Sequence, residues 1–222
     1  MKKPLERSSV SDQERQHWLG NRKKGIGGSD AACILGLNPW KTNVQLWKEK
    51  TGQEEPEDIS DKSVVIYGKQ AEEHLRHLFE LDFPQYKVEY DEFKMFHNTD
   101  NPFIFATLDG WLTAADGRKG VLEIKTTEIM NSRQWRKWND NNIPDNYYIQ
   151  VLHQLLATGY DFAVLKAQIK YRKGDDMSLT TRHYFIEREE VKDDIELLQE
   201  KEIEFWDMVQ KRMEPPLLLP SI

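Results

Sequence analysis

The chain has 222 residues, of which 38% are apolar, and its 31 Lys and Arg against 38 Asp and Glu give a formal charge of -7. That length and apolar content suffice for one globular domain with a continuous core. No run of about 18 apolar residues occurs and the first thirty residues lack an apolar signal segment, so we expect a cytoplasmic protein without a membrane partner. Cys33 stands alone, which excludes an intramolecular disulfide, a cysteine-based zinc site and a four-cysteine iron-sulfur cluster.

Charge is unevenly distributed along the chain. Basic residues cluster at 22–24, 118–119, 133–137 and 170–173, whereas acidic residues concentrate at 54–61 and 187–204. A net negative charge argues against a general polyanion binder. Local basic patches still suit a phosphate-bearing partner, because electrostatic steering depends on the local field.

The first fifty residues carry two helix-start signals of the same kind. Ser11 followed three residues later by Glu14 forms a capping-box pattern and predicts a helix that ends near residue 21. Thr42 with Gln45 repeats the pattern and predicts a second helix, which ends at Gly52.

Two further helices are predicted before the strands begin. The glycine-rich stretch NRKKGIGGSDAACILG predicts a short apolar helix with Ser29 at its N-cap and Gly36 at its end. A longer helix is expected from about 61 to 82, with an apolar stripe formed by Ala71, Leu75, Leu78 and Phe79.

From residue 86 onward the pattern becomes short, aromatic and β-branched. Three strands are predicted as an antiparallel meander, at 86–93, 103–113 and 120–127. The next elements are expected in the order helix, helix, strand, strand, helix, at 132–138, 144–158, 162–172, 180–188 and 189–213. We therefore expect an α/β fold in which helices flank a central mixed sheet, with a helical part at about 11–82, a sheet-centred core at 86–188 and a C-terminal helix at 189–213.

Three charged residues lie inside segments that otherwise predict buried strands. Asp109 belongs to FATLDGW, and Glu123 and Lys125 belong to GVLEIKTT, although a buried ionised group costs several kcal/mol unless it is paired or binds a metal. Glu123 and Lys125 project from one face of their strand, and a turn at Asp116 and Gly117 places residue 109 beside them. Two carboxylates so close repel unless a cation lies between them, and Mg2+ or Mn2+ suits such oxygen ligands. The lysine ammonium beside that ion could hold or help deprotonate a water aimed at phosphorus.

Each of these patterns also has a simpler interpretation. The set of Asp109, Glu123 and Lys125, taken alone, is typical of a cross-strand or surface ion pair. Glu72 followed by Arg76 is typical of an i,i+4 pair on a helix surface.

Two other stretches combine polar groups with helical spacing. Near Ser29, free backbone N–H groups with the basic residues 22–24 upstream predict an anion or phosphate pocket, or else a plain capped turn. The helix in YYIQVLHQLLATG places Tyr147, Gln150 and Gln154 along adjacent faces, where they line a site or face solvent.

Taken together and in this order, these segments resemble the lambda-type phage exonucleases, also called the viral recombinase or YqaJ-like family, within the PD-(D/E)XK nuclease superfamily. The match runs from about Trp18 to Glu189 through NRKKGIGGSDAACILGLNPW, YGKQAEEHL, TLDGW, LEIKTT, YYIQVLHQLLATG and HYFIERE. Each piece alone is common, whereas the ordered set is specific. The resemblance implies a restriction-endonuclease-like core and a single nuclease domain over residues 1–222.

The resemblance also implies a role for each charged residue of the strands. Asp109, Glu123 and the backbone carbonyl of Ile124 would hold the catalytic Mg2+, for which Mn2+ would substitute. Glu72 would complete the site through a second metal or through water. Lys125 would position or activate the attacking water.

The remaining site residues follow from the same resemblance. Gln150 and Tyr147 would orient Lys125 and the substrate, and Arg22 with Ser29 would bind the 5'-phosphate of a DNA end. The sequence departs from the family pattern at Leu108, where Pro often precedes the catalytic Asp. We expect no effect, since only the Asp side chain carries the ligand atoms.

The activity implied by the resemblance is metal-dependent 5'-to-3' degradation of one strand of linear double-stranded DNA. The product would be a 3' single-stranded tail for an annealing partner protein, made by a homotrimeric ring in the cytoplasm of a host cell. Two alternatives stay open: a structure-specific or restriction-type endonuclease of the same fold, and a non-catalytic module that binds DNA ends.

Overall fold

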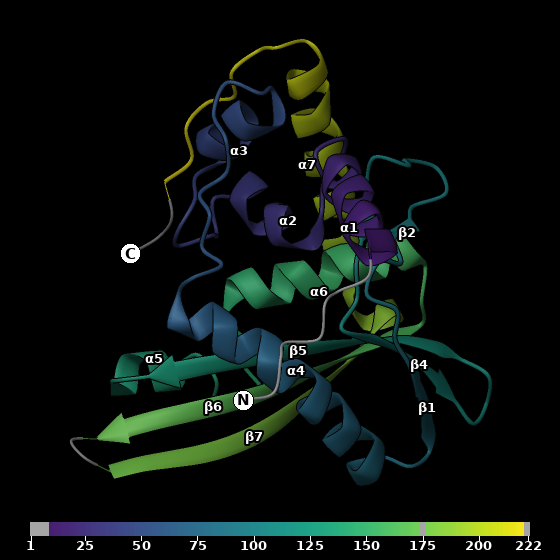
Figure 1. Ribbon diagram of the computed structural model, residues 1–222, viewed down its shortest axis with the longest axis vertical. Helices are drawn as coiled ribbons and strands as arrows, with labels where there is room; N and C mark the ends of the chain where they lie inside the picture. The colour runs from purple at the N-terminus through teal and green to yellow at the C-terminus, as the bar shows by residue number, and fades with distance from the viewer. Residues whose placement is uncertain (1–8, 174–175, 220–222) are drawn as a thin grey trace.

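A five-stranded sheet forms the centre of the structure, a computed structural model that describes residues 9–173 and 176–219 (Figure 1). Its strand order is β1-β4-β5-β6-β7, with the bounds Tyr86–Glu89, Gly110–Ala114, Lys119–Ile129, Phe162–Lys173 and Asp176–Glu187. β5 and β6 run parallel, whereas the other neighbouring pairs of this sheet are antiparallel. The expected α/β fold with a central mixed sheet is therefore confirmed.

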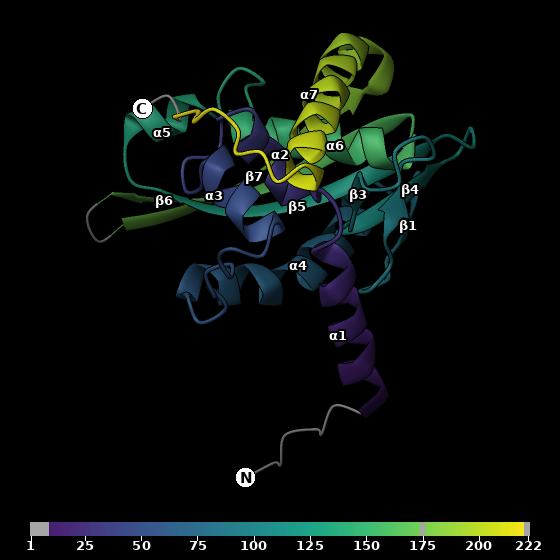
Figure 2. The same cartoon turned by 90° about the horizontal axis from the view of Figure 1, so that it is seen from above.

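Helices cover both faces of this sheet. The parallel pair β5 and β6 requires a crossover connection, which α5 (Ser132–Arg136) and α6 (Asp145–Thr158) supply. α6 lies across one face, and α4 (Ser63–Asp82) lies across the other (Figures 1 and 2). The charged strand β5 is therefore enclosed between two helices.

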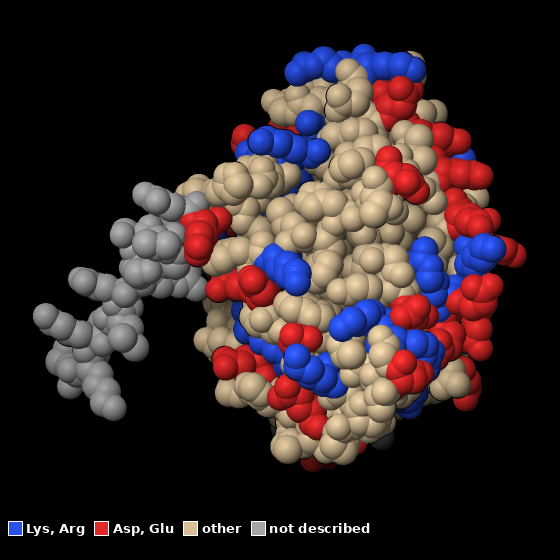
Figure 3. All heavy atoms as spheres, turned by 90° about the vertical axis from the view of Figure 1, so that its right-hand side faces the viewer, with Lys and Arg blue, Asp and Glu red and all other residues tan. Residues whose placement is uncertain are grey.

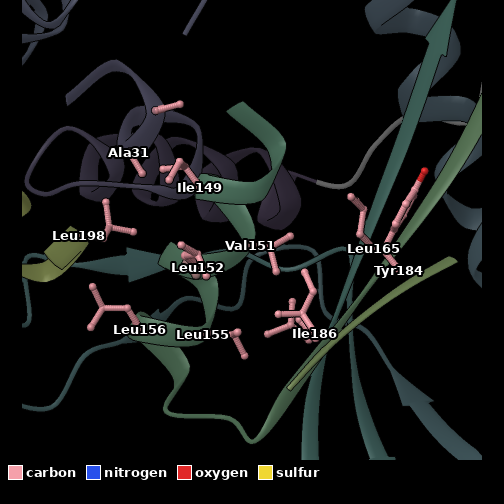
Figure 4. Packing of buried hydrophobic residues seen from close by; sticks show 14 of the residues in the cluster. Ala31, Ile149, Val151, Leu152, Leu155, Leu156, Leu165, Tyr184, Ile186 and Leu198 are labelled. Atoms are coloured by element: carbon pink, nitrogen blue, oxygen red, sulfur yellow. The ribbon is translucent and has the colours of Figure 1, made fainter. Parts of the chain in front are cut away.

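Alternation along the strands builds one core on each face. Val121 and Leu165 point toward α6, whereas Leu122 and Val164 point toward α4. Figure 4 shows the larger core, in which Leu152, Leu155 and Leu156 of α6 pack among residues of α2, α7, β6 and β7. Each fully buried leucine contributes about 1.5–3 kcal/mol through removal of its apolar surface from water. α6 is thus rigidly fixed over the sheet.

Two N-terminal helices, α2 and α3, pack with the C-terminal helix α7 at one end of the molecule. α1, α2 and α3 span Ser9–Arg22, Gly28–Ile34 and Asn43–Lys50, and a short 3-10 turn, η1 (Arg188–Val191), precedes α7 (Lys192–Gln210). In Figure 2, α1 projects away from the rest of the structure. None of the described helices combines the length and the apolar character needed to cross a bilayer.

The helix starts agree with one of the two capping predictions. Thr42 Oγ1 accepts the Gln45 backbone N–H at 3.2 Å, and Gln45 Oε1 accepts the Thr42 N–H at 2.8 Å, so the capping box of α3 is confirmed. The helix expected to start at Ser11 already includes Ser9, which makes the predicted start wrong. The side chain of Ser11 lies outside the described residues.

Two other expectations are wrong for reasons of packing. Leu78 is 48% exposed, because the face of α4 that meets the sheet runs through Leu75 and Phe79 and leaves Leu78 on its flank. The strand expected at 103–113 is divided into β3 (Phe105–Ala106) and β4. β3 pairs with β2 (Phe96–His97) in a separate two-stranded sheet, and the chain changes direction before β4 begins.

Candidate active site

A hairpin brings the two predicted strand carboxylates together. β4 and β5 pair in the register Gly110↔Leu122, and the turn between them contains Gly117 with φ +90°, which glycine adopts without strain. Asp109 precedes the last pair and so lies opposite Glu123. Its Oδ2 accepts a hydrogen bond of 2.8 Å from the Ile124 N–H. The sequence-based prediction that residue 109 lies beside 123–125 therefore agrees with the structure.

Side chains from two elements hold the Glu123 carboxylate, which is 2% exposed. Lys125 Nζ lies 2.5 Å from its Oε1, and Gln150 Nε2 donates to the same oxygen at 2.6 Å. Gln154 Nε2 donates to Oε2 at 2.5 Å from one turn further along α6. These donors replace the lost hydration and fix both carboxylate oxygens. Gln150 and Lys125 thus share one oxygen of Glu123, while the Tyr147 ring centroid lies 5.3 Å from the Lys125 ammonium.

The backbone of β5 adds an oxygen to this site. Because the N–H and C=O of one strand residue point to the same side, the Ile124 carbonyl faces the space beyond the start of β4. Its side chain points the other way, into the core formed with Leu75 of α4. The Leu122 side chain also points into this core. Leu122 and Ile124 are therefore buried against α4, while Glu123 and Lys125 face α6.

α4 brings a third carboxylate to the opposite side of the gap. Glu72 lies one turn from Arg76, whose Nη1 stands 3.5 Å from Glu72 Oε1 and also donates to the backbone carbonyl of Asp109. The Arg76 guanidinium carbon lies 3.6 Å from the ring centroid of Tyr90. One buried arginine therefore joins α4 to the start of β4, and the interpretation of Glu72 and Arg76 as a surface pair is wrong.

Negative charge is in excess within this cluster. Burial raises the pKa of Asp109 well above its usual value, and repulsion from Glu123 and Glu72 raises it further. Burial also raises the pKa of Glu72, although Arg76 opposes the rise. Burial alone would lower the pKa of Lys125, but attraction to Glu123 and Asp109 outweighs it and the net shift is upward. Lys125 is therefore an ammonium at neutral pH, and an additional cation would relieve the remaining repulsion.

The donor set fits a hard divalent cation. Asp109 and the Ile124 carbonyl face the same gap beside Glu123, and oxygen ligands of this kind are the ones that Mg2+ and Mn2+ prefer. Across 9–173 and 176–219, no three His, Cys, Asp or Glu side chains stand close enough together to share one ion. In this conformation Asp109, Glu123 and Glu72 therefore do not surround one ion together.

The predicted phosphate pocket has a different cap from the one expected. Gly27, and not Ser29, is the N-cap of α2, because Asp30 reaches back to accept the Gly27 N–H at 3.0 Å. Ser29 is exposed in the first turn of the helix. Arg22 donates from Nη1 to Thr107 Oγ1 at 3.3 Å, two residues before Asp109.

The start of α2 also contacts the helix that holds Glu123. A Cβ atom on Gly28 would lie 3.2 Å from Gln150 Cγ, so glycine permits this close approach. Asp30 pairs with Lys50 at 2.7 Å. Among the described residues no carboxylate forms an ion pair with Arg22, which leaves guanidinium donors free beside the strand that leads to the carboxylates.

Comparison with known proteins identifies the family. The model of the YqaJ-like viral recombinase domain matches residues 17–161, which is more than half of the chain. The chain belongs to this family. The uncharacterized protein YqaJ of Bacillus subtilis (strain 168) is 37% identical over 199 residues, which cover 89% of this chain and 57% of that relative. The chain therefore spans little more than half the length of this YqaJ relative.

Solved structures show the same fold. An alkaline exonuclease from Laribacter hongkongensis superposes with a TM-score of 0.65 at 15% identity, over 90% of this chain and 94% of that chain. A phage-related exonuclease from Haemophilus somnus 129PT gives 0.53 at 13% identity, over 85% and 96%. The segment matched by the YqaJ-like family contains every site residue predicted from the sequence, from Arg22 to Gln150.

Sequence reasoning assigned no definite role to three buried polar residues of α4 and α6 in this YqaJ-like chain. Arg76 was expected in a surface pair, and Gln154 was left between lining a site and facing solvent. Gln154 repeats the polar position of Gln150 at i+4, which is the signal that places both on one face. His153, fully buried, bonds Glu202 of α7 at 2.7 Å. The signal for that pair is an acidic residue within the otherwise apolar buried stripe of α7.

Proposed function

We propose that this YqaJ-like chain is a metal-dependent DNA exonuclease that hydrolyses phosphodiester bonds from the ends of linear duplex DNA. One observation carries the proposal: Asp109, Glu123 and Lys125 converge at the start of β4, and two amides of α6 fix the Glu123 carboxylate. Buried like charges lower stability, and such strain is common where chemistry requires it. The fold shared with two exonucleases supports the same reaction class.

Asp109, Glu123 and the Ile124 carbonyl would hold the catalytic Mg2+, with Mn2+ as a substitute and Glu72 connected through water or a second ion. When bound, the ion supplies positive charge that polarises the phosphate and makes water a better nucleophile. Lys125, as an ammonium, orients the attacking water by hydrogen bonding and attracts the charge that develops on phosphate oxygens.

The positioning groups of the site act through Glu123 and Asp109. Gln150 and Gln154 restrict the Glu123 carboxylate to one orientation, and Tyr147 covers the Lys125 ammonium. Arg76 holds the backbone at Asp109, immediately before β4. Preorganisation of this kind lets charged groups act without reorganising during the reaction.

We further propose that the enzyme prefers a 5'-phosphorylated end and degrades that strand in the 5'-to-3' direction. Arg22 supports this assignment because its guanidinium retains free donors and contacts Thr107, close in sequence to Asp109. Ser29 adds an exposed hydroxyl and an N–H group in the first turn of α2. A phosphate held there would place the first phosphodiester of the strand toward the carboxylates. The product would be a 3' single-stranded tail for an annealing partner protein.

A homotrimeric ring around DNA would reconcile the charge of -7 with a polyanionic substrate. Figure 3 shows one face of the molecule, on which acidic residues gather along one edge while basic and acidic residues mix elsewhere. In the ring, basic groups would line the channel and acidic groups would face outward. Light scattering that gives a stable monomer at micromolar concentration would exclude this assembly.

Digestion of matched DNA substrates tests the proposed reaction. With Mg2+, we expect purified protein to degrade linear duplex DNA, to leave a closed circle intact and to stop on addition of EDTA. Glu123→Gln should abolish the reaction. Glu128→Gln on the same strand should not, because that exposed carboxylate pairs only with Arg172 at 3.1 Å among the described residues. Cutting of the circle would assign an endonuclease, and tight end binding without cleavage would assign a binding module.

A further inference from the structure

A long β-ribbon extends beyond the active site. β6 and β7 pair from Phe162↔Glu187 to Lys173↔Asp176, whereas β5 ends at Ile129, opposite Tyr171. α5 follows β5 after a short connection and lies over this end of the ribbon, on the same face of the sheet as α6 (Figures 1 and 2). The Trp135 and Tyr171 ring centroids are 6.0 Å apart at an interplanar angle of 52°.

Hydrogen bonds within α5 and from the ribbon hold this segment in place. Asn131 caps the helix by accepting the Gln134 N–H at 3.0 Å. Arg182 of β7 donates to the Trp138 carbonyl, and its guanidinium carbon lies 5.0 Å from the Trp135 ring centroid. The Trp135 ring is therefore held in place at the surface rather than free to rotate into solvent.

The rings border a hollow lined by hydroxyl groups. Its volume is about 340 Å³, and its lining residues are Ser132, Trp135, Tyr171, Ser178 and Thr180. The two aromatic residues are partly exposed and the three hydroxyl residues are exposed. The hollow thus combines flat apolar surfaces with hydrogen-bonding groups.

Three cations of α5 and its C-cap lie beside this hollow. Arg133, Arg136 and Lys137 are exposed, and within 9–173 and 176–219 none of them forms an ion pair. Several other lysines have an acidic partner, as at Lys23–Glu55, Lys48–Glu54, Lys201–Glu204 and Lys211–Asp207, whereas the exposed Lys24, Lys69 and Lys94 form no ion pair within the described residues. In a protein of net charge -7, three positive charges without an ion-pair partner among the described residues therefore lie beside two partly exposed aromatic rings.

We propose that this α5–ribbon surface, formed by Trp135, Tyr171, Arg133, Arg136 and Lys137, binds single-stranded nucleic acid. Unpaired bases stack on Trp135 and Tyr171, and the three cations contact phosphates. A duplex fits poorly, because its bases already stack on one another and expose no faces to the rings. The hydroxyl groups of the hollow accept and donate hydrogen bonds without selecting one base.

The surface lies along a path from the proposed catalytic residues. The part of β5 from Lys125 to its end at Ile129 is about 13 Å long at 3.3 Å per residue, and α5 begins three residues later. A strand that leaves the carboxylates can therefore reach the rings within a few nucleotides. The inference goes beyond the proposed hydrolysis, because binding at this surface requires neither the carboxylates nor a metal.

Fluorescence anisotropy with a labelled oligothymidylate tests the proposal in EDTA, where no hydrolysis interferes. We expect Trp135→Ala to weaken binding roughly 5- to 150-fold, the range for loss of one stacked base. Trp135→Phe, which keeps a ring, should retain most of the affinity. The double variant Arg133→Glu with Arg136→Glu should bind more weakly and should reduce the slope of log K against log salt by about 1.4, at 0.7 per phosphate contact.

Matched controls separate this surface from general effects. Trp40→Ala removes a tryptophan that is 74% exposed elsewhere, and Lys201→Glu with Lys211→Glu makes the same charge change on α7. Both should leave affinity for the single strand unchanged, and circular dichroism should show all variants folded. Equal losses in the controls, unchanged affinity in Trp135→Ala, or equal weakening for a blunt duplex would overturn the proposal. Because EDTA is present throughout, the result does not depend on whether the protein is a nuclease.

Discussion

Replacement of Asp109 by Asn should stabilise the protein while it removes activity. The amide oxygen of Asn can still accept the Ile124 N–H that Asp109 Oδ2 accepts at 2.8 Å. The substitution therefore removes charge and little else. Burial and repulsion from Glu123 and Glu72 raise the pKa of Asp109, so its ionised form opposes folding at neutral pH.

The expected gain follows from the surroundings of the carboxylate. Replacement of buried charges by neutral groups of similar shape stabilises proteins by up to about 4 kcal/mol. Lys125 and the Ile124 N–H compensate part of the Asp109 charge, so we expect about 1–2 kcal/mol. For a chain of this size that corresponds to a rise in Tm of about 2–8 °C.

The gain should depend on pH with a defined sign. Below the unfolded pKa of Asp, about 3.9, both states of the wild type are protonated and Asp109 carries no penalty. As pH rises toward the raised folded pKa, the unfolded state ionises first and the wild type loses stability relative to Asp109→Asn. Urea unfolding of both proteins in EDTA, at pH values between 5 and 8, should show a difference that grows with pH.

Asp116 in the same hairpin provides the control. Hydrogen bonds from the Arg118 side chain and N–H lower the pKa of this exposed residue, so Asp116→Asn should change stability slightly and in the opposite direction. Mg2+ should raise the Tm of the wild type more than that of Asp109→Asn, because a ligand stabilises only the state that binds it. If Asp109→Asn were equally or less stable than the wild type at pH 8, the carboxylates would not be under repulsion and the reasoning would be refuted.

Three further substitutions test other parts of the site. Lys125→Ala should abolish cleavage and leave binding to DNA ends nearly unchanged in gel-shift assays; a mere fall in Tm with cleavage retained would make the lysine structural. Arg22→Ala should lose the preference for 5'-phosphorylated over 5'-hydroxyl ends in digestion rates, and equal losses on both ends would contradict its role. Burial alone would lower the pKa of His153, but Glu202 raises it overall. The pair should therefore stabilise the folded state fully below the unfolded pKa of His, about 6.5. This stabilisation should be lost as pH rises through the folded pKa. His153→Gln should lack that dependence, and an unchanged pH profile in urea unfolding would contradict the assignment.

Local signals in the sequence predicted those features that depend on neighbouring residues. The alternation of β5 and the turn around Gly117 placed Asp109 beside Glu123, and the register Gly110↔Leu122 agrees. The capping box at Thr42 also depends on residues three positions apart and was predicted correctly. Resemblance to a family supplied the remaining site residues, which no spacing in this chain identifies by itself.

Features that depend on packing between distant elements were not predictable in the same way. Arg76 looked like half of a surface pair, and only the approach of α4 to Asp109 turns it inward. Ser29 looked like an N-cap, but the reach of Asp30 back to Gly27 moves the cap by two residues. In both cases, a competing contact decided between two locally reasonable arrangements.

The most direct test of the account is a timed digestion that follows each strand of a linear duplex. One duplex carries a 5'-phosphate on a single strand, a second carries only 5'-hydroxyl ends, and each is incubated with Mg2+ and either the wild type or Lys125→Ala. We predict stepwise loss of the phosphorylated strand from its 5' end by the wild type, slower attack on hydroxyl ends, and no loss with the variant. Equal digestion by Lys125→Ala, or loss from the 3' end, would contradict the assignment of Asp109, Glu123 and Lys125 as a 5'-to-3' exonuclease site.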